Sequence, residues 1–294
     1  MDKWTELRTA YQVAKLGTVS AAAEAEGVHR ATINRHIDIL EAELGARVFL
    51  RHARGYALTD VGADLLQVAG KAEELVNDLA GRARGPNGQL SGEVKVTTLA
   101  PLAPLVMTGI ADFHRRFPAS FVTFIATDNL ARLEHGEAHV ALRAGSKPKH
   151  PDYVVQSFGR LRFGLYAHDT YVARNGLPER VEQLSGHYLI GPGDANDRVP
   201  FRRWIDEKVP EQSIAFRSSN PSVIRTAVDS GLAMGFLGEH EALGRPDLHR
   251  VFPFRKDWAV ALWLVTHVDL HRTKKVQALL ACIKDANQLR TGSK

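Results

Sequence analysis

The sequence predicts a small helical unit at the N-terminus followed by a larger α/β domain. Before residue 60, apolar residues recur at helical spacing between glycines. After residue 92, short apolar runs typical of strands alternate with amphipathic helical segments. Between them, residues 81–92 are rich in glycine and contain a proline, which is typical of a hinge. A chain of 294 residues is long enough for about two domains with cores of their own.

The composition favours a reducing compartment and leaves the class of partner open. The single cysteine, Cys282, cannot form an intramolecular disulfide. Charged residues interrupt the N-terminus, so it does not resemble a signal peptide, and no window is apolar over the roughly 18 residues of a membrane span. We therefore expect a cytoplasmic protein without a membrane partner. The net charge of +5 permits a polyanionic partner but does not identify one.

The first 45 residues predict three helices separated by glycines. Helical spacing of apolar residues in the first helix ends at Gly17, and a short helix of small residues, capped by Thr18 or Ser20, ends at Gly27. A third helix begins near His29 and buries a stripe on one side. That stripe consists of Ile33, Ile37, Leu40 and Leu44. The opposite face of the third helix displays Arg30, Thr32, Asn34, Arg35 and His36.

This order is typical of a helix-turn-helix, in which the last helix offers polar and basic side chains to a DNA groove. Arginine can recognise guanine and asparagine can recognise adenine, because their fork and amide geometries match the base edges. Each such pairing of a side chain with its base favours the correct base over a wrong one by roughly 1 to 3 kcal/mol. The alternative interpretation is an ordinary solvated helix face.

A short hairpin and a long helix follow the third helix. Arg51 and Arg54 lie around Gly55, between two apolar runs, which predicts a wing whose cations can contact phosphate. Thr59 is placed to cap the long helix. Its apolar set is Val61, Leu65, Leu66, Val68, Ala69, Ala72, Leu75, Val76 and Leu79. We expect this stripe to pack against the same helix of a second copy, the alternative being packing on the second domain.

Beyond residue 92, the alternation of strand-like apolar runs with amphipathic helical segments predicts βαβ units. We expect these units to form a largely parallel sheet that is divided between two lobes. We expect strands at 94–98, 121–125, 140–143, 163–167, 214–217, 233–237 and 260–265. We expect helices at 105–117, 130–135, 222–230 and 273–289.

Polar side chains follow three of these strands, where ligands bind in doubly wound folds. They are Thr98, Asn129, Ser219 and Asn220. Their hydroxyl and amide groups, together with free backbone N–H groups, suit a carboxylate or another small anion. The alternative for Asn129, Ser219 and Asn220 is a role as helix caps.

Residues 20–62 resemble the LysR-type transcriptional regulator family in Leu40-Glu41, Leu44-Gly45, Phe49, Arg51, Leu58-Thr59 and Gly62. The family's base and phosphate contacts map onto Arg30, Ala31, Asn34, Arg35, Arg51 and Arg54. With Ser20 and Thr32 these form the DNA-binding set that we expect. His29 and Asn34 stand where serine is common, Arg30 where glutamine is common and Asp38 where a basic residue is common. An unusual operator is therefore expected.

The second domain resembles the family's periplasmic-binding-protein-like effector domain more loosely. The matching motifs are Gly92-x-Val94-x-Val96, the run 113–118, Gly136-Glu137, the run 231–235 and Thr266-His267-x-Asp269-Leu270. The family's ligand positions then carry over to Thr98, Asn129, Ser219 and Asn220. Ala119 and His139 depart from the family's usual aspartates.

No motif for catalysis or a cofactor is present. The sequence lacks the serine hydrolase elbow, the dinucleotide glycine fingerprint and the Walker lysine. His267 and His271 are spaced like metal ligands, but Arg272, Lys274 and Lys275 would repel a dication. We expect neither an enzyme nor a metal site.

The expected protein is a sequence-specific DNA-binding transcription factor that responds to a small-molecule effector. We assign residues 1–59 to a winged helix-turn-helix, 60–91 to a linker helix and hinge, and 92–294 to the effector domain. Its lobes comprise about 92–160 with 266–294, and 161–265. Expected partners are double-stranded DNA in the nucleoid, a small-molecule effector, RNA polymerase, and further copies of the chain as a homodimer or homotetramer. The alternatives are an architectural DNA-binding protein without an effector and a stand-alone solute-binding domain.

Overall fold

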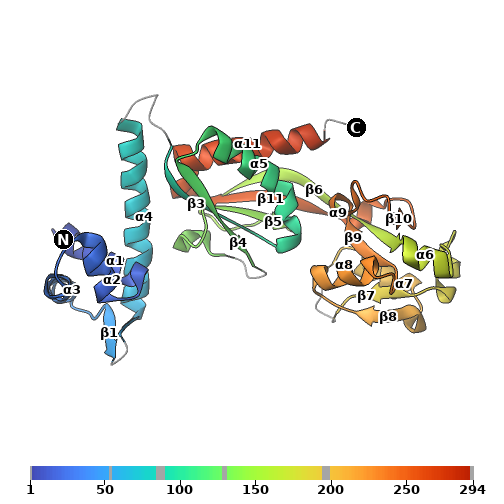
Figure 1. The fold of residues 1–294 in the computed structure, drawn as a ribbon, viewed down its shortest axis with the longest axis horizontal. Coiled ribbons are helices and arrows are strands. Elements are labelled where there is room, and N and C mark those ends of the chain that lie inside the picture. Colours follow the sequence, from blue (N-terminus) through green and yellow to red (C-terminus); the bar gives the residue numbers. More distant parts are fainter. Residues whose placement is uncertain (1, 53–54, 84–89, 128–130, 194–198, 292–294) are drawn as a thin grey trace.

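The computed structural model describes residues 2–52, 55–83, 90–127, 131–193 and 199–291 (Figure 1). The N-terminal unit contains helices α1 (Trp4–Leu16), α2 (Val19–Glu26) and α3 (Arg30–Leu44), and the hairpin β1 (Phe49–His52) and β2 (Gly55–Leu58). Helix α4 (Asp60–Ala83) follows. These bounds confirm the three helices, the wing and the long helix that the sequence predicts.

The ends of these helices follow the expected local chemistry. Gly17, Gly27 and Gly45 end α1, α2 and α3 in the left-handed conformation, with φ of +77°, +66° and +65°. The side chain of Thr18, rather than that of Ser20, caps α2 by accepting from the backbone N–H of Ala21 at 3.1 Å.

The N-terminal unit has its own apolar core, and the first half of α4 belongs to it. Leu65 and Ala69 of α4 are buried there together with Ile33, Ile37 and Leu40 of α3. The apolar set of α4 is therefore divided: part of it packs within this unit, and not against a second copy or the second domain.

One sheet of seven described strands extends through both lobes of the second domain. Its path is β10 (Leu248–Arg250), β6 (Tyr153–His168), β11 (Ala259–His267), β5 (Val140–Ala144), β3 (Gly92–Thr98) and β4 (Ser120–Ala126). Strand β9 (Gly235–Gly238) pairs with β6 beside that path. Strand β3 is parallel to β4 and β5, but β11 is antiparallel to β5 and β6. The prediction of a largely parallel sheet is therefore wrong for these central strands.

The antiparallel pairs arise because β6 and β11 are the two long strands that connect the lobes. They pair from Tyr153 with His267 to Arg162 with Ala259. Residues 262–265 of β11 also pair with β5 of the first lobe. The lobe boundary expected at residue 266 lies within β11 and stays a prediction.

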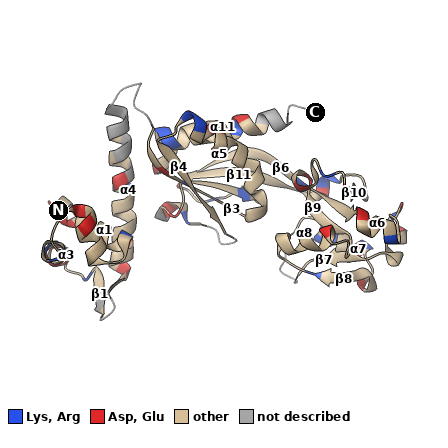
Figure 2. Cartoon of the chain, in the orientation of Figure 1, with Lys and Arg blue, Asp and Glu red and all other residues tan. Residues whose placement is uncertain are grey.

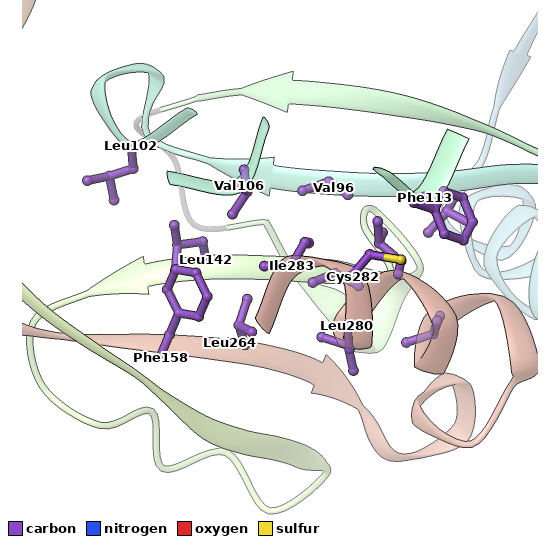
Figure 3. Close-up of a cluster of buried hydrophobic side chains, with 14 of the residues drawn as sticks. Val96, Leu102, Val106, Phe113, Leu142, Phe158, Leu264, Leu280, Cys282 and Ile283 are labelled. Carbon is purple, nitrogen blue, oxygen red and sulfur yellow. The ribbon is translucent and has the colours of Figure 1, made fainter. Parts of the chain in front are cut away.

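Helices α5 (Ala103–Arg116) and α11 (Lys274–Thr291) cover one face of the first lobe's sheet. Figure 3 shows Val106 and Phe113 of α5 close to Cys282 and Ile283 of α11, within the largest apolar cluster. A Cβ atom at Gly109 would lie 2.4 Å from the Cα of Ile283, so glycine permits the close approach of these helices. Cys282 is buried among these apolar side chains.

The second lobe contains helices α6 (Asp169–Asn175), α7 (Arg202–Lys208), α8 (Pro221–Asp229) and α9 (Glu239–Ala242) and the parallel strands β7 (Leu189–Gly191) and β8 (Ile214–Arg217). Phe201, Trp204, Phe236 and Trp258 form an aromatic cluster in its core. The expected helix at 130–135 is described only as the 3-10 turn Leu133–His135, and residue 130 lies outside the described residues. Helix α10 (Val268–His271) precedes α11. Across the described residues, no helix combines the length and apolar character needed to span a bilayer.

Candidate DNA interface and effector site

The exposed face of α3 carries the residues that the sequence predicts for DNA contact. Arg30, Ala31 and Arg35 are exposed, and Thr32 and Asn34 are partly exposed. Because the buried stripe of α3 packs against the rest of the unit, this face is directed outward. In the described part of the chain, neither Arg30 nor Arg35 has an acidic partner within ion-pair distance. Both guanidinium groups are thus available to an external anion.

The charges of the N-terminal unit are mixed rather than uniformly basic (Figure 2). Some arginines are neutralised within the unit: Arg8 lies 3.3 Å from Glu26, and Arg47 lies 3.1 Å from Glu41. Affinity for DNA would therefore depend on where the unpaired cations lie and not on the net charge of the unit.

The structure places two of the three remaining residues that we expect to contact DNA. Ser20 is exposed on α2 and does not serve as the cap of that helix. Arg51 lies on β1, where its backbone is the register partner of Tyr56. Arg54 lies outside the described residues.

Two further residues, Glu41 and Tyr56, connect the wing to α3. Glu41 belongs to the family motif Leu40-Glu41 but had no predicted role, and no prediction was made for Tyr56. The Glu41 carboxylate is buried and accepts the backbone N–H groups of Val48 at 2.8 Å and Phe49 at 3.1 Å. The Tyr56 hydroxyl donates to Oδ1 of Asn34 at 3.0 Å. An acidic residue four positions after Ile37, on the apolar stripe of α3, was the available signal for Glu41.

Helix α1 is tied to α4 by a polar cluster. The Tyr11 hydroxyl donates to Glu73 at 2.9 Å, and the Lys15 ammonium donates to the same carboxylate at 3.1 Å. Burial, and then the hydrogen bond to Glu73, raise the pKa of Tyr11. The orientation of α4 relative to the DNA-facing unit is thereby restrained.

Part of the apolar stripe of α4 remains exposed outside this core. Val68 and Val76 are each 63% exposed, and Leu79 is 57% exposed. Beside them, a groove of about 410 Å³ lies between α1 and α4 and includes Trp4, which is 66% exposed. Such a contiguous apolar face is typical of an interaction surface.

In the second domain, Thr98 lies at the carboxyl end of β3. Its side chain is 4% exposed, and its hydroxyl has no hydrogen-bond partner among the described residues. A buried hydroxyl without a partner costs about 1 to 3 kcal/mol, so a ligand or water at this point would relieve that cost.

Asn220 and Ser219 lie where β8 leads into α8. Oδ1 of Asn220 accepts from the N–H groups of Ser222 at 2.9 Å and Val223 at 3.3 Å, so it caps α8. Ser219 is exposed beside it, and Asn129 lies outside the described residues. Asn220, one of the four expected ligand residues, therefore uses its amide oxygen as a helix cap, which is the alternative role that the sequence allowed.

The lobes face each other across a pocket of about 430 Å³. Ala100 and Pro101 line it from the first lobe, and Pro221, Ser222 and Arg225 line it from the second. Ala100 is two residues after Thr98 and Pro221 directly follows Asn220, although Thr98, Ser219 and Asn220 do not line the pocket themselves.

His267 and His271 take part in the local fold. His267 caps α10 by accepting from the N–H of Asp269, and Nδ1 of His271 lies 2.8 Å from the Thr266 hydroxyl. Within the described part of the chain, no group of three or more His, Cys, Asp or Glu residues is arranged to hold a metal ion.

Comparison with known proteins identifies both parts of the chain. Residues 4–63 match the family described as bacterial regulatory helix-turn-helix protein, lysR family, and residues 87–288 match the LysR substrate binding domain. An HTH-type transcriptional repressor of Pseudomonas aeruginosa is 26% identical over 73% of this chain and 67% of its own length.

Solved structures show the same fold over nearly the whole chain. A full-length OxyR variant from Pseudomonas aeruginosa has a TM-score of 0.68 and 22% identity, covering 97% of this chain and 94% of its own. Full-length CbnR, solved in complex with its target DNA, has a TM-score of 0.60 and 20% identity, covering 97% of this chain and 100% of its own. With a family match over 87–288, the chain belongs to the LysR family of DNA-binding transcription regulators that carry an effector-binding domain.

Proposed function

We propose that this regulator recognises specific duplex DNA sequences through α3 and contacts the phosphate backbone through its wing. The observation that carries the proposal is the outward face of α3, where Arg30 and Arg35 have no acidic partner in the described structure. Contacts from α3 to base edges would provide selectivity, and Arg51 and Arg54 would provide salt-dependent affinity.

The exposed stripe of α4 supports assembly as a homodimer. Val68, Val76 and Leu79 are too exposed to serve the core of their own chain. A second copy of α4 offers a matching stripe, because both helices have the same sequence. Such a dimer would present two α3 helices to two half-sites of duplex DNA.

The second domain would bind a small-molecule effector between its lobes. The buried hydroxyl of Thr98, without a partner in the described structure, and the exposed Ser219 at the start of α8 are the groups that we assign to it. They suit a small anion with hydrogen-bond acceptors, such as a carboxylate.

Fluorescence anisotropy tests the DNA-binding proposal. The full chain would be titrated onto DNA from upstream of its own gene and onto a shuffled duplex, at about 150 mM salt. We expect a preference of about 10³ or more for the first duplex, lost in Arg35→Ala. Arg250→Ala, which removes one exposed cation from the second lobe, is the charge-matched control and should keep the preference.

Equal affinity of the wild type for both duplexes, with steep salt dependence, would contradict this proposal. It would favour an architectural DNA-binding protein. A preference that survives in Arg35→Ala would contradict the assignment of α3 as the reading helix.

A further inference from the structure

Among the described residues, a hydrogen bond to Asn34 joins the wing to the DNA-facing side of α3. Tyr56 projects from β2, and its hydroxyl donates to Oδ1 of Asn34 at 3.0 Å. The ring of Tyr56 meets the ring of Phe49 edge to face, with centroids 5.4 Å apart and an interplanar angle of 76°. A tyrosine of the wing therefore contacts an asparagine of α3, the helix that we propose recognises DNA.

The position of this tyrosine is set independently of Asn34. Phe49 is 3% exposed, and its backbone N–H is bound to the carboxylate of Glu41. Glu41 lies seven residues, or two helical turns, after Asn34, so both side chains are on the same side of α3. The helix thus fixes the strand through Glu41, the strand fixes the ring through Phe49, and the ring presents its hydroxyl to Asn34.

This contact restricts what Asn34 can offer to DNA. Recognition of adenine by asparagine uses the amide oxygen as acceptor and the amide nitrogen as donor together. At Asn34, the oxygen is directed to the phenol and already accepts one hydrogen bond. The nitrogen, Nδ2, makes no hydrogen bond with any described residue. Rotating the amide so that its oxygen and nitrogen both meet one base edge would break the bond to Tyr56, whereas the nitrogen can donate with the oxygen still held on the phenol.

We propose that Tyr56 is a specificity-determining residue, which holds the Asn34 amide as a hydrogen-bond donor so that α3 selects guanine rather than adenine at that base. Guanine presents two acceptors, O6 and N7, to an amide donor in the major groove, whereas adenine presents only N7 as an acceptor, and its N6 amino group is a donor with which an amide nitrogen cannot pair. The inference rests on the proposed sequence-specific binding by α3. It replaces the expectation, from the sequence alone, that an asparagine here favours adenine.

Selection from a pool of randomised duplexes tests this role with the full-length protein. Asn34→Ala identifies the base position that Asn34 reads, because discrimination at that position is lost. We expect the wild type to enrich guanine there, and Tyr56→Phe to shift the ratio of guanine to adenine toward adenine by about tenfold or more. In the Asn34→Ala background, Tyr56→Phe should change nothing at that position.

Tyr11→Phe is the matched control. It also removes one phenolic hydrogen bond within the N-terminal unit, from Tyr11 to Glu73, but it leaves α3 and the wing unchanged. We expect it to enrich the same sequence as the wild type. Thermal unfolding of all variants would show that the domain remains folded.

Two results would overturn the inference, and they are distinguishable. If the wild type enriches a sequence and Tyr56→Phe enriches the same one with the same guanine to adenine ratio, Tyr56 is merely structural. If the wild type enriches no sequence at all, the proposed function fails, and this inference fails with it.

Discussion

At the scale of single residues, Tyr171 and His187 form a hydrogen-bonded pair in the second lobe whose protonation follows from burial. The Tyr171 hydroxyl accepts the backbone N–H of Tyr188 at 2.9 Å and lies 3.1 Å from Nδ1 of His187. With its oxygen engaged as an acceptor, the hydroxyl can donate its proton to a neutral imidazole. Burial lowers the pKa of His187 and raises the pKa of Tyr171, so both groups favour their neutral forms in the folded protein.

This arrangement predicts a loss of stability in mild acid. The pKa of His187 is lower in the folded chain than in the unfolded chain, where it is about 6.5. The unfolded state therefore binds the proton more readily, and the free energy of unfolding falls as the pH drops below about 6.5. Burial lowers the pKa of His271 as well, so protonation of His271 also lowers the free energy of unfolding in mild acid.

Urea unfolding between pH 5 and 8 measures this effect. We expect His187→Gln to weaken the dependence of the unfolding free energy on pH without abolishing it, since His271 remains. Thr108→Ala, at an exposed site of α5 that does not titrate between pH 5 and 8, is the control and should leave the dependence unchanged. A His187→Gln variant with the same dependence as the wild type would refute this account.

At the scale of elements, α4 has two roles along its length. Leu65 and Ala69 complete the core of the N-terminal unit, while Val68, Val76 and Leu79 remain exposed. The cluster of Tyr11, Glu73 and Lys15 keeps α4 fixed on α1. A contact made by the exposed stripe would therefore also orient the reading helix, which is packed in the same core.

A charge on this stripe should disrupt the homodimer without unfolding the chain. Val68→Glu would bury an unpaired carboxylate between two helices, and we expect the dimer dissociation constant to rise at least about tenfold, or 1.4 kcal/mol. Sedimentation equilibrium measures it. Ala63→Glu is the control, since Ala63 is exposed two residues from Val61, on the opposite side of the helix. Equal dimerisation of the wild type and Val68→Glu would exclude this stripe as the interface.

At the scale of the whole molecule, the two lobes are joined by β6 and β11 and touch at a few side chains. Nε2 of His240 lies 2.8 Å from the carbonyl oxygen of Pro101, which links α9 to the first lobe. Lys71 of α4 lies 4.0 Å from Asp269, next to the first lobe. A ligand that changes the angle between the lobes could act on α4 through such contacts. If it alters DNA affinity, DNA must alter its affinity by the same factor.

The effector proposal predicts that Thr98→Val removes ligand binding without weakening the fold. The Thr98 hydroxyl has no partner among the described residues, so replacing it by a methyl group should leave the unfolding free energy equal or higher. We expect a library of small organic carboxylates to contain compounds that raise the melting temperature of the wild type. Thr98→Val and Ser219→Ala should lose that response and retain basal DNA binding.

Ser185→Ala, at an exposed site of the second lobe, serves as the control for this experiment. A wild-type response that persists unchanged in Thr98→Val and Ser219→Ala would place the ligand elsewhere. Loss of basal DNA binding together with the ligand response would show that these residues support the fold instead.

Local patterns in the sequence determine the three N-terminal helices, the wing and the long helix α4. Gly17, Gly27 and Gly45 end their helices because only glycine adopts the left-handed conformation at little cost, a property of each residue by itself. The outward position of Arg35 is equally local, because helical periodicity places it on the side of α3 away from Ile33 and Ile37, whereas Arg30 is exposed at the first residue of the helix.

The tertiary structure decides which groups meet across long stretches of chain. Tyr56 and Asn34 are 22 residues apart, and their hydrogen bond depends on the packing of the wing against α3. The antiparallel pairing of β11 with β5 joins residues more than 100 positions apart, and neither strand's composition encodes that direction. Contacts of this kind depend on how the elements assemble, so local periodicity cannot reveal them.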